Sequence, residues 1–346
     1  MDSGKQGTGA ADDYRIPPCC ITCSRTTCRI HSQRTGRRDQ WTRIVSWRTM
    51  NADAREPAAA TACARSSELL GFSPDARVLI VNSDDFGMYH AINTAVIDSI
   101  EKGIASSCSL MVPCPWALHA MHLLRQNPRI PFGIHLTLFY DTTHYRWGPL
   151  SARERVPSLL DKRGHLFTTA KVPELLAQAR INEVELEFRA QIDAVVEGGL
   201  TPTHLDWHCL ADGGRDDIFD LTVALAEEYG LAVRVWLEPG RRKMRQRRLP
   251  VTDNQFLDSF RLDTDDKSAR YAELLHDLPV GLNEWAVHPG LSNEESRAID
   301  PDGWLVRQTD YDFLTSPEAR EILQQEGINV IDYKTIQQSW FQTSTQ

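Results

Sequence analysis

Short runs of apolar, largely β-branched residues alternate along the chain with stretches of helical periodicity. The first run, Val78-Leu79-Ile80-Val81, is too short for a helix and is typical of a buried strand. Similar patterns predict strands at 106–112, 132–138, 203–208, 231–237, 283–288 and 328–333. Apolar residues spaced by three and four predict helices at 91–100, 116–125, 173–196, 216–229, 267–277 and 317–326. This alternation indicates βαβ units, and about seven parallel strands fit a closed or nearly closed α/β barrel better than a five-stranded open sheet.

The first predicted strand ends in two adjacent carboxylates, Asp84 and Asp85, followed by Phe86 and Gly87. Two anionic side chains at one strand tip repel each other and lose hydration, so they need a cation or a shared proton. The alternative is an ordinary turn, in which aspartate side chains bond to backbone amides and Gly87 takes a positive φ. The histidines further along the chain favour the cation.

Three later strand patterns each carry histidine. His135 lies within one of them, and His204, Asp206 and His208 alternate along the next, so that they share one face. His288 stands where a further strand should end. A single buried histidine is more often a core residue than a ligand. Four strands that each supply a carboxylate or an imidazole, however, favour a metal site.

The barrel architecture places this chemistry at one rim, because active sites of such folds lie at the carboxyl ends of the strands. Asp84, Asp85, His208 and His288 fall at those ends. His135 lies in the middle of its apolar run, so its participation requires that strand to end early or to tilt inward.

Four of these segments together resemble a known family. They are residues 82–87 (NSDDFG), 133–136 (GIHL), 203–208 (THLDWH) and 287–289 (VHP), and they are similar to the signature blocks of the YdjC-type carbohydrate deacetylases, which include the chitooligosaccharide deacetylases. The resemblance spans roughly residues 76–336 in order. It implies a distorted (β/α) barrel related to the polysaccharide deacetylases, a divalent metal ion, and removal of acetyl from an N-acetylated sugar.

The resemblance also implies roles at the matching positions. Asp84 would be the catalytic base, and Asp85, His135 and His208 would be the metal ligands. His288 would be a candidate catalytic acid. Family members commonly continue the Asp-x-His motif with further histidines, whereas Cys209 follows here, which leaves the metal triad intact and the substrate open.

Aromatic residues and a basic run complete the candidate features. Aromatic side chains are expected near the strand tips, where their faces suit the C–H faces of sugars, and core packing explains some of them equally well; they are Tyr140, Tyr145, Trp147, Trp207 and Trp236. The basic run at 241–248 could bind phosphate or an acidic glycan, but it has no interleaved aromatic residues to stack on bases, and we expect a solvated loop between strand and helix.

Length and charge limit the remaining classes. The chain has 346 residues and a formal net charge of −9 (38 basic against 47 acidic), which argues against a general affinity for nucleic acid. The chain has no apolar stretch of about 18 residues, so no membrane span is predicted. Residues 1–73 are rich in Ser, Thr, Gly, Arg and then Ala, and we expect a disordered extension and linker there, with Met50 as an alternative start. Residues 74–340 would then form the barrel domain.

The cysteines favour a reducing compartment. Four of the eight, Cys19, Cys20, Cys23 and Cys28, lie in the extension. Cys20 and Cys23 have zinc-site spacing but lack a second ligand pair at a loop-closing distance, so unpaired cysteines are the favoured interpretation. No secreted disulfide framework is evident, and a cytoplasmic location is therefore expected.

The sequence thus predicts a metal-dependent hydrolase that removes the N-acetyl group from an acetylated amino sugar or oligosaccharide. One divalent metal ion is expected, with Zn, Mg, Mn, Fe and Co left open. The N-acetylated sugar is the expected partner, without nucleic acid or membrane, and a homodimer is compatible with the sequence. The alternatives are a metal-dependent hydrolase of another amide or a phosphoester, and a non-catalytic sugar-binding protein on the same fold.

Overall fold

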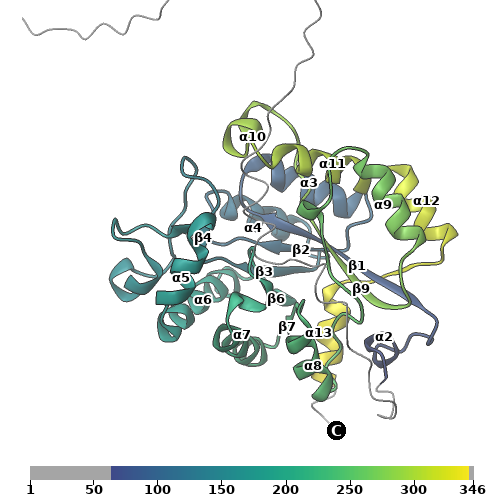
Figure 1. Cartoon of the computed structure of the whole chain (residues 1–346), viewed down its shortest axis with the longest axis horizontal. Coiled ribbons are helices and arrows are strands. Elements are labelled where there is room, and N and C mark those ends of the chain that lie inside the picture. Colours follow the sequence, from purple (N-terminus) through teal and green to yellow (C-terminus); the bar gives the residue numbers. More distant parts are fainter. Residues whose placement is uncertain (1–63, 343–346) are drawn as a thin grey trace, which may run out of the picture. The chain divides into compact units, whose positions relative to one another are not determined.

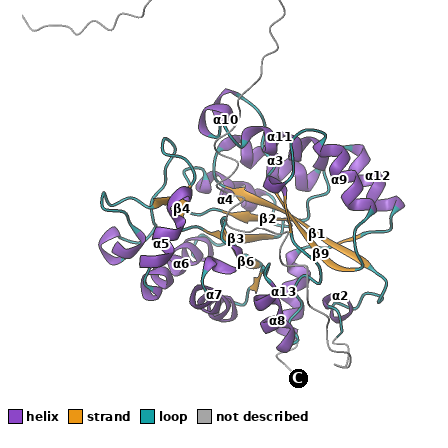
Figure 2. Cartoon of the chain, viewed as in Figure 1, coloured by secondary structure: helices purple, strands orange, loops and turns teal. Residues whose placement is uncertain are grey.

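The structure is a computed structural model that describes residues 64–342, and a parallel sheet lies at the centre of this part of the chain (Figure 1, Figure 2). Its strands lie in the order β7-β6-β3-β2-β1-β9-β8, and β10 pairs with the beginning of β1. All pairings in this sheet are parallel. The end strands β7 and β8 are not paired with each other in the described residues, so the sheet is an open half-barrel. The predicted α/β fold with about seven parallel strands is confirmed.

Every predicted strand is present, although several are shorter than their apolar runs, and β8 was not predicted. The strands of the main sheet are β1 (Arg77–Phe86), β2 (Ser107–Leu110), β3 (Phe132–Leu136), β6 (His204–Trp207), β7 (Ala232–Val233), β8 (Leu257–Asp258), β9 (Gly281–Val287) and β10 (Asn329–Val330). Two further short strands, β4 (Phe139–Tyr140) and β5 (Phe167–Thr168), pair with each other between β3 and α5 in the chain.

β1 is the central strand of the sheet. Its central position explains why residues 78–81 are all apolar. β9 pairs with it from Arg77 to Ser83, and β10 and then β2 pair with its other edge. Val78, Leu79, Ile80 and Val81 are at most 1% exposed, because both faces of the sheet are covered. In Figure 1, α3, α9, α11 and α12 lie above the strands, and α6, α7, α8 and α13 lie below them.

Helices connect the strands. Their bounds are α2 (Ser66–Leu69), α3 (His90–Glu101), α4 (Ala117–Gln126), α5 (Val172–Gln178), α6 (Ile181–Val196), α7 (Asp216–Tyr229), α8 (Glu238–Gln246), α9 (Lys267–His276), α10 (Glu294–Ile299), α11 (Trp304–Leu314), α12 (Pro317–Gln325) and α13 (Tyr333–Gln342). None of them is both long and apolar enough to cross a membrane. The helices at 90–101, 117–126, 216–229, 267–276 and 317–325 agree with the predicted periodicity, whereas α2, α8, α10, α11 and α13 were not predicted.

Three local expectations were wrong. The single helix predicted over 173–196 is divided into α5 and α6, because Ala179 and Arg180 have extended backbones and the Arg180 amide donates to Ser158 Oγ at 2.9 Å. The strand predicted over 231–237 shortens to β7. The basic run is largely helical, since α8 begins with Pro239 at its first turn and buries Gly240 and Met244.

The expected linker is described only from residue 64 onward. There, the amides of Ser66 and Ser67 in α2 donate to the Asp253 carboxylate at 2.8 and 3.2 Å. The expectations for residues 1–63, including the cysteine pair Cys20 and Cys23, lie outside the described residues.

Candidate metal and catalytic site

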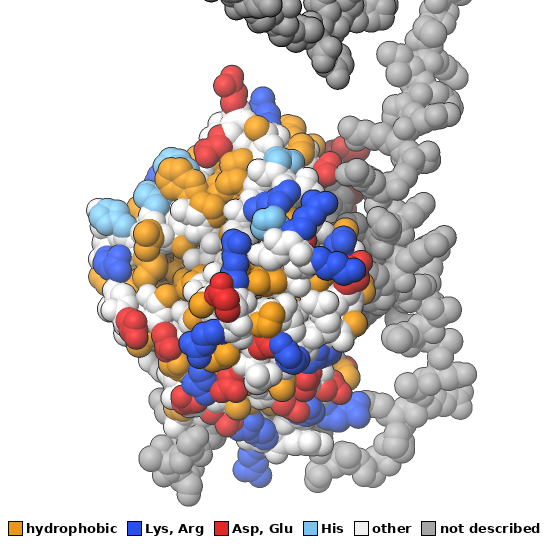
Figure 3. Space-filling view, turned by 90° about the vertical axis from the view of Figure 1, so that its left-hand side faces the viewer, with side chains coloured by type: hydrophobic (Ala, Val, Ile, Leu, Met, Phe, Trp, Pro, Cys, Tyr) orange, Lys and Arg blue, Asp and Glu red, His pale blue; other side chains and the backbone are white. Residues whose placement is uncertain are grey.

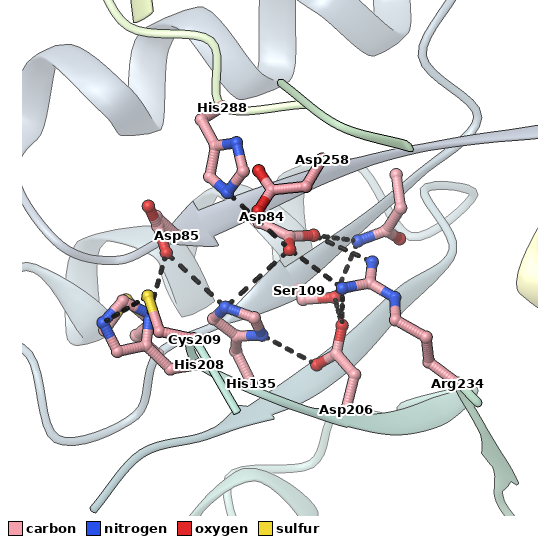
Figure 4. A network of polar contacts seen from close by, with 12 residues as sticks. Asp84, Asp85, Ser109, His135, Asp206, His208, Cys209, Arg234, Asp258 and His288 are labelled. Atoms are coloured by element: carbon pink, nitrogen blue, oxygen red, sulfur yellow. Dashed lines mark hydrogen bonds and ion pairs between the residues drawn. The ribbon is translucent and has the colours of Figure 1, made fainter. Parts of the chain in front are cut away.

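Asp84 and Asp85 both enter the site because the backbone of β1 departs from regular strand geometry at its end. Successive residues of a regular strand face opposite sides, so two adjacent aspartates would be separated. Asp85 instead has φ 65°, a left-handed conformation that aspartate tolerates better than most residues. The register with β2 shifts between Ser83 and Phe86. Both carboxylates are therefore 2% exposed and point toward the same cluster (Figure 4).

Asp84 is fixed by a guanidinium group. Arg234, which follows β7, donates from Nη1 to Asp84 Oδ2 and from Nη2 to Asp84 Oδ1, each at 2.8 Å. Asn82 Nδ2 also donates to Asp84 Oδ1 at 2.7 Å. Oδ1 thus accepts two hydrogen bonds and Oδ2 accepts one, so Oδ2 retains a lone pair for a further partner. Oδ2 lies 3.9 Å from Nε2 of both His135 and His288.

Asp85 has a second arginine and one oxygen without a hydrogen bond. Arg307 Nη2, from α11, lies 2.8 Å from Asp85 Oδ2. The other oxygen, Oδ1, is buried without a hydrogen-bond partner, although His208 Nδ1 approaches it to 3.2 Å and His135 Nε2 to 3.5 Å. Burial by itself raises the pKa of Asp85, but Arg307 and the two histidines outweigh it and hold that pKa well below its usual value. Asp85 is therefore ionised at neutral pH.

A carboxylate contacts each histidine at the ring nitrogen that faces away from Asp85 Oδ1. His135 Nδ1 lies 2.9 Å from Asp206 Oδ1, and His208 Nε2 lies 2.9 Å from Asp141 Oδ1. Such carboxylate–histidine pairs commonly fix the tautomer and ring direction of metal-binding imidazoles. Burial lowers the pKa of His135, yet Asp206 and Asp84 raise it to about 9, so the imidazole holds a proton that a metal ion would displace.

The residues present fit a divalent metal ion. One oxygen of Asp85 and one nitrogen each of His135 and His208 lie within 4.8 Å of one another. The two histidine nitrogens approach Asp85 Oδ1 without hydrogen-bond geometry. This is expected when three ligand atoms point at a common metal position rather than at one another. A two-histidine, one-carboxylate set leaves positions open for water and substrate.

The charge of the cluster agrees with this fit. Four buried carboxylates meet two guanidinium groups, so up to two negative charges remain when the histidines are neutral. The carboxylates are those of Asp84, Asp85, Asp206 and Glu284, and the guanidinium groups are those of Arg234 and Arg307. A divalent cation would balance the difference.

His288 stands beside Asp84 on the same rim. Its Nδ1 lies 2.8 Å from Ser259 Oγ, and its backbone amide donates to Asp310 Oδ2 at 2.8 Å. The ring of Phe260, which is 41% exposed, contacts the His288 ring at 4.6 Å between centroids. The structure thus brings Asp84, Asp85, His135, His208 and His288 into one cluster. The strand of His135 ends one residue beyond it, as a ligand role requires.

Several residues of the site escaped the sequence analysis. They are Asp141, Arg234, Asp310 and Arg307, which lie in loops or helices of the structure. Arg234 falls within the strand predicted over 231–237, and residues 307–310 also resemble the family, but neither signal assigned a role to these residues. Asp206 carried a signal, since it shares one strand face with His204 and His208. His204 is not part of the metal cluster: it is fully buried and stacks on Tyr333, and burial lowers its pKa to about 3.

Three of the five aromatic residues expected near the strand tips pack in the core instead. Trp207, Tyr140 and Trp147 are less than 10% exposed and pack in the core. Trp236 is half-buried and stacks on Phe256. Phe260, which the sequence analysis did not select, is the exposed aromatic ring next to the cluster. Figure 3, which faces the side on which β4 and α5 lie, shows hydrophobic side chains interspersed with Lys and Arg.

Fold and site together define an α/β half-barrel with a carboxylate–imidazole centre at the carboxyl ends of its strands. Comparison with known proteins shows that the chain belongs to the YdjC-like protein family, whose model matches residues 78–325. The carbohydrate deacetylase of Clostridium beijerinckii is 29% identical over 260 residues, which cover 75% of this chain and 99% of that protein. The carbohydrate deacetylase of Thermus thermophilus is 33% identical, covering 71% of this chain and 89% of the relative.

A third relative and a crystal structure extend the comparison. The chitooligosaccharide deacetylase of Yersinia enterocolitica is 27% identical, over 74% of this chain and 98% of that protein. A crystal structure from Enterococcus faecalis, provisionally described as a cellobiose-phosphate cleavage protein, matches with a TM-score of 0.66 and 26% identity. It covers 75% of this chain and 99% of its own and supports the same fold.

Proposed function

We propose that the chain is a metal-dependent carbohydrate deacetylase that hydrolyses the acetamide group of an N-acetylated amino sugar or its oligomer. The observation that carries the proposal is the unpartnered, buried Oδ1 of Asp85, which faces one nitrogen each of His135 and His208. A second carboxylate, that of Asp84, stands beside it with a free lone pair. The names of the family relatives supply the substrate class.

Asp85, His135 and His208 would hold the divalent ion. When bound, such an ion lowers the pKa of a coordinated water and polarises the carbonyl of the scissile amide. Asp206 and Asp141 keep the two imidazole rings in place, and Arg307 holds Asp85 Oδ2 so that Oδ1 faces the histidines.

Asp84 would act as the general base through Oδ2. Arg234 occupies one lone pair of each oxygen of this carboxylate, while Asn82 occupies the second lone pair of Oδ1. Oδ2 alone can therefore take the proton of the attacking water.

His288 would donate the proton to the leaving amine from Nε2, with Ser259 holding Nδ1. The distance of 3.9 Å between His288 Nε2 and Asp84 Oδ2 is compatible with one residue acting as the base and the other as the acid. The attacking oxygen and the amide nitrogen are bonded to one carbon in the tetrahedral intermediate, so a base and an acid that serve them stand close together. Phe260 offers an exposed ring for the sugar at this position.

The test is a product assay on the full-length chain with a panel of N-acetylated chitooligosaccharides and a sugar phosphate. We expect equal amounts of acetate and free amine from the former and no phosphate from the latter. Asp84→Asn should abolish most acetate release, whereas Asp265→Asn, a substitution of an exposed aspartate, should not. Phosphate release without acetate would contradict the proposal and favour a phosphoesterase.

A further inference from the structure

Cys209 presents a thiol to the outer side of the candidate metal cluster. It follows β6 and His208 directly, is exposed, and has φ 52°. Its Sγ lies 3.7 Å from His208 Nε2, the nitrogen that faces away from Asp85, and 3.9 Å from Nδ1 of the same ring. Asp141 Oδ1 approaches the same nitrogen to 2.9 Å. One ligand atom each of Asp141, His208 and Cys209 therefore lies within 4.8 Å of the others.

We propose that Asp141, His208 and Cys209 form a second cation site, selective for a soft divalent ion such as zinc or cadmium. Thiolate and imidazole ligands select such ions over magnesium or calcium, and the inner set of Asp85, His135 and His208 contains no sulfur. The outer site is also reachable, because Cys209 is exposed and the Asp141 side chain is 24% exposed.

The two sites share His208 through different nitrogens. Its Nδ1 lies 3.2 Å from Asp85 Oδ1 in the inner site, and its Nε2 lies 2.9 Å from Asp141 Oδ1 in the outer one, where Cys209 Sγ is slightly nearer to Nε2 than to Nδ1. A neutral imidazole has one lone pair, since the other nitrogen carries the proton. An ion held at Nε2 therefore leaves Nδ1 protonated and unable to bind the inner ion. Occupation of the outer site withdraws one of the three inner ligands.

This competition makes the outer site inhibitory, a consequence that rests on the proposed function. At low concentration a divalent ion would fill the inner site and support hydrolysis. Excess zinc would fill the outer site and lower the rate. Ions that bind thiolate poorly, such as magnesium, would not inhibit.

Cobalt(II) titration of the full-length chain tests the site without reference to activity. A cobalt–thiolate bond gives a near-ultraviolet charge-transfer band, and we expect this band in the wild type. Cys209→Ser should remove the contribution of the outer site and weaken cadmium binding there by about 10–100-fold, as loss of a supporting metal-site partner does. The quadruple variant Cys19→Ser/Cys20→Ser/Cys23→Ser/Cys28→Ser controls for the four cysteines of the N-terminal extension and should keep the contribution of the outer site.

A further variant separates this inference from the proposed function. His135 belongs to the inner site alone, so His135→Ala should keep the cobalt–thiolate band while losing the inner ion. If Cys209→Ser shows the same band and the same cadmium affinity as the wild type, the outer site does not exist. If the band depends on Cys209 but excess zinc inhibits the wild type and Cys209→Ser equally, the site exists but does not compete for His208, and the proposed competition is wrong.

Discussion

Both terminal nitrogens of Arg234 lie 2.8 Å from the carboxylate oxygens of Asp84. The same guanidinium contacts Asp206 and Glu284, each at 2.8 Å, so one cation joins the proposed base to the carboxylate behind His135. Because the fork fixes both oxygens of Asp84, it determines which lone pair remains free for the attacking water.

Replacement of Arg234 by lysine should preserve the charge and lose the fork. A lysine ammonium is a point donor and cannot hold two carboxylate oxygens in one plane. We expect Arg234→Lys to bind metal and to lower kcat by about 10–100-fold, the usual cost of losing a supporting partner. Steady-state kinetics with parallel metal analysis check this. An unchanged kcat would show that the fork does not position Asp84.

The two adjacent aspartates should respond differently to the same substitution. Asp84→Asn should keep bound metal and lower kcat by roughly 10²–10⁴, the typical contribution of a general base. Asp85→Asn should lose metal, because it removes the anionic ligand. Elemental analysis of both variants decides the assignment, and metal loss from Asp84→Asn alone would reverse the two roles.

Arg307 should couple metal binding to stability. Its removal leaves Asp85 buried without its arginine partner, and breaking a buried ion pair in this way typically costs about 3–5 kcal/mol. A bound divalent ion would replace part of that charge. We therefore expect metal to raise the melting temperature of Arg307→Gln more than that of the wild type. The control is Arg297→Gln, an exposed arginine of α10, and equal metal-induced shifts in both variants and the wild type would contradict the coupling.

Glu284 should make the stability of the metal-free protein depend on pH. Burial raises its pKa from 4.5 to about 7, although Arg234 and Tyr333 oppose the change. The folded state thus favours the protonated form, and the stability this gives is complete below the unfolded pKa and is lost as the pH rises through the folded one. Relative to Glu284→Gln, the wild type should lose on the order of 3 kcal/mol between about pH 4 and pH 8.

Urea unfolding of the two proteins across that range measures the difference. Glu273→Gln, which alters an exposed glutamate of α9, should follow the wild type. A difference between wild type and Glu284→Gln that does not change with pH would show that Glu284 is ionised, or neutral, throughout.

The sequence was most informative where function and local pattern coincide. Asp84, Asp85, His208 and His288 stand at the ends of short apolar runs, and the fold brings such ends to one rim. Their positions could therefore be predicted without knowing any tertiary contact. His135 lies in the middle of its predicted strand, and the early end of β3 at Leu136, which a ligand role requires, is visible only in the structure.

The counter-ions could not be predicted in this way. Arg234 is 150 residues from Asp84 in the chain, and the strand pattern over 231–237 that contains it does not show which carboxylate it contacts. Arg307 lies in α11, a helix that the periodicity did not predict. The sequence did indicate a turn at this strand end, and Gly87 has the expected positive φ of 99° while the Met88 amide donates to Asp85 O at 3.1 Å. The left-handed backbone of Asp85 itself, which turns both aspartates toward one site, was not predicted.

The prediction of local secondary structure was wrong where charge or apolar periodicity concealed the actual element. The charges of residues 241–248 concealed a helix whose buried positions, Gly240 and Met244, are four residues apart. The apolar periodicity of 173–196 continued across Ala179 and Arg180, where contacts to Ser158 break the helix. In both cases long-range packing decided the structure and local composition did not.

The central claim is that Asp85, His135 and His208 hold a metal ion on which amide hydrolysis depends. Its most direct test is metal content and acetate release measured on the same preparations of wild type, His135→Ala and His122→Ala, an exposed histidine of α4. We predict that wild type and His122→Ala hold the inner ion and release acetate, that chelation stops both, and that His135→Ala lacks the inner ion and the activity. Acetate release by His135→Ala or by the chelated wild type at the full rate would contradict the claim.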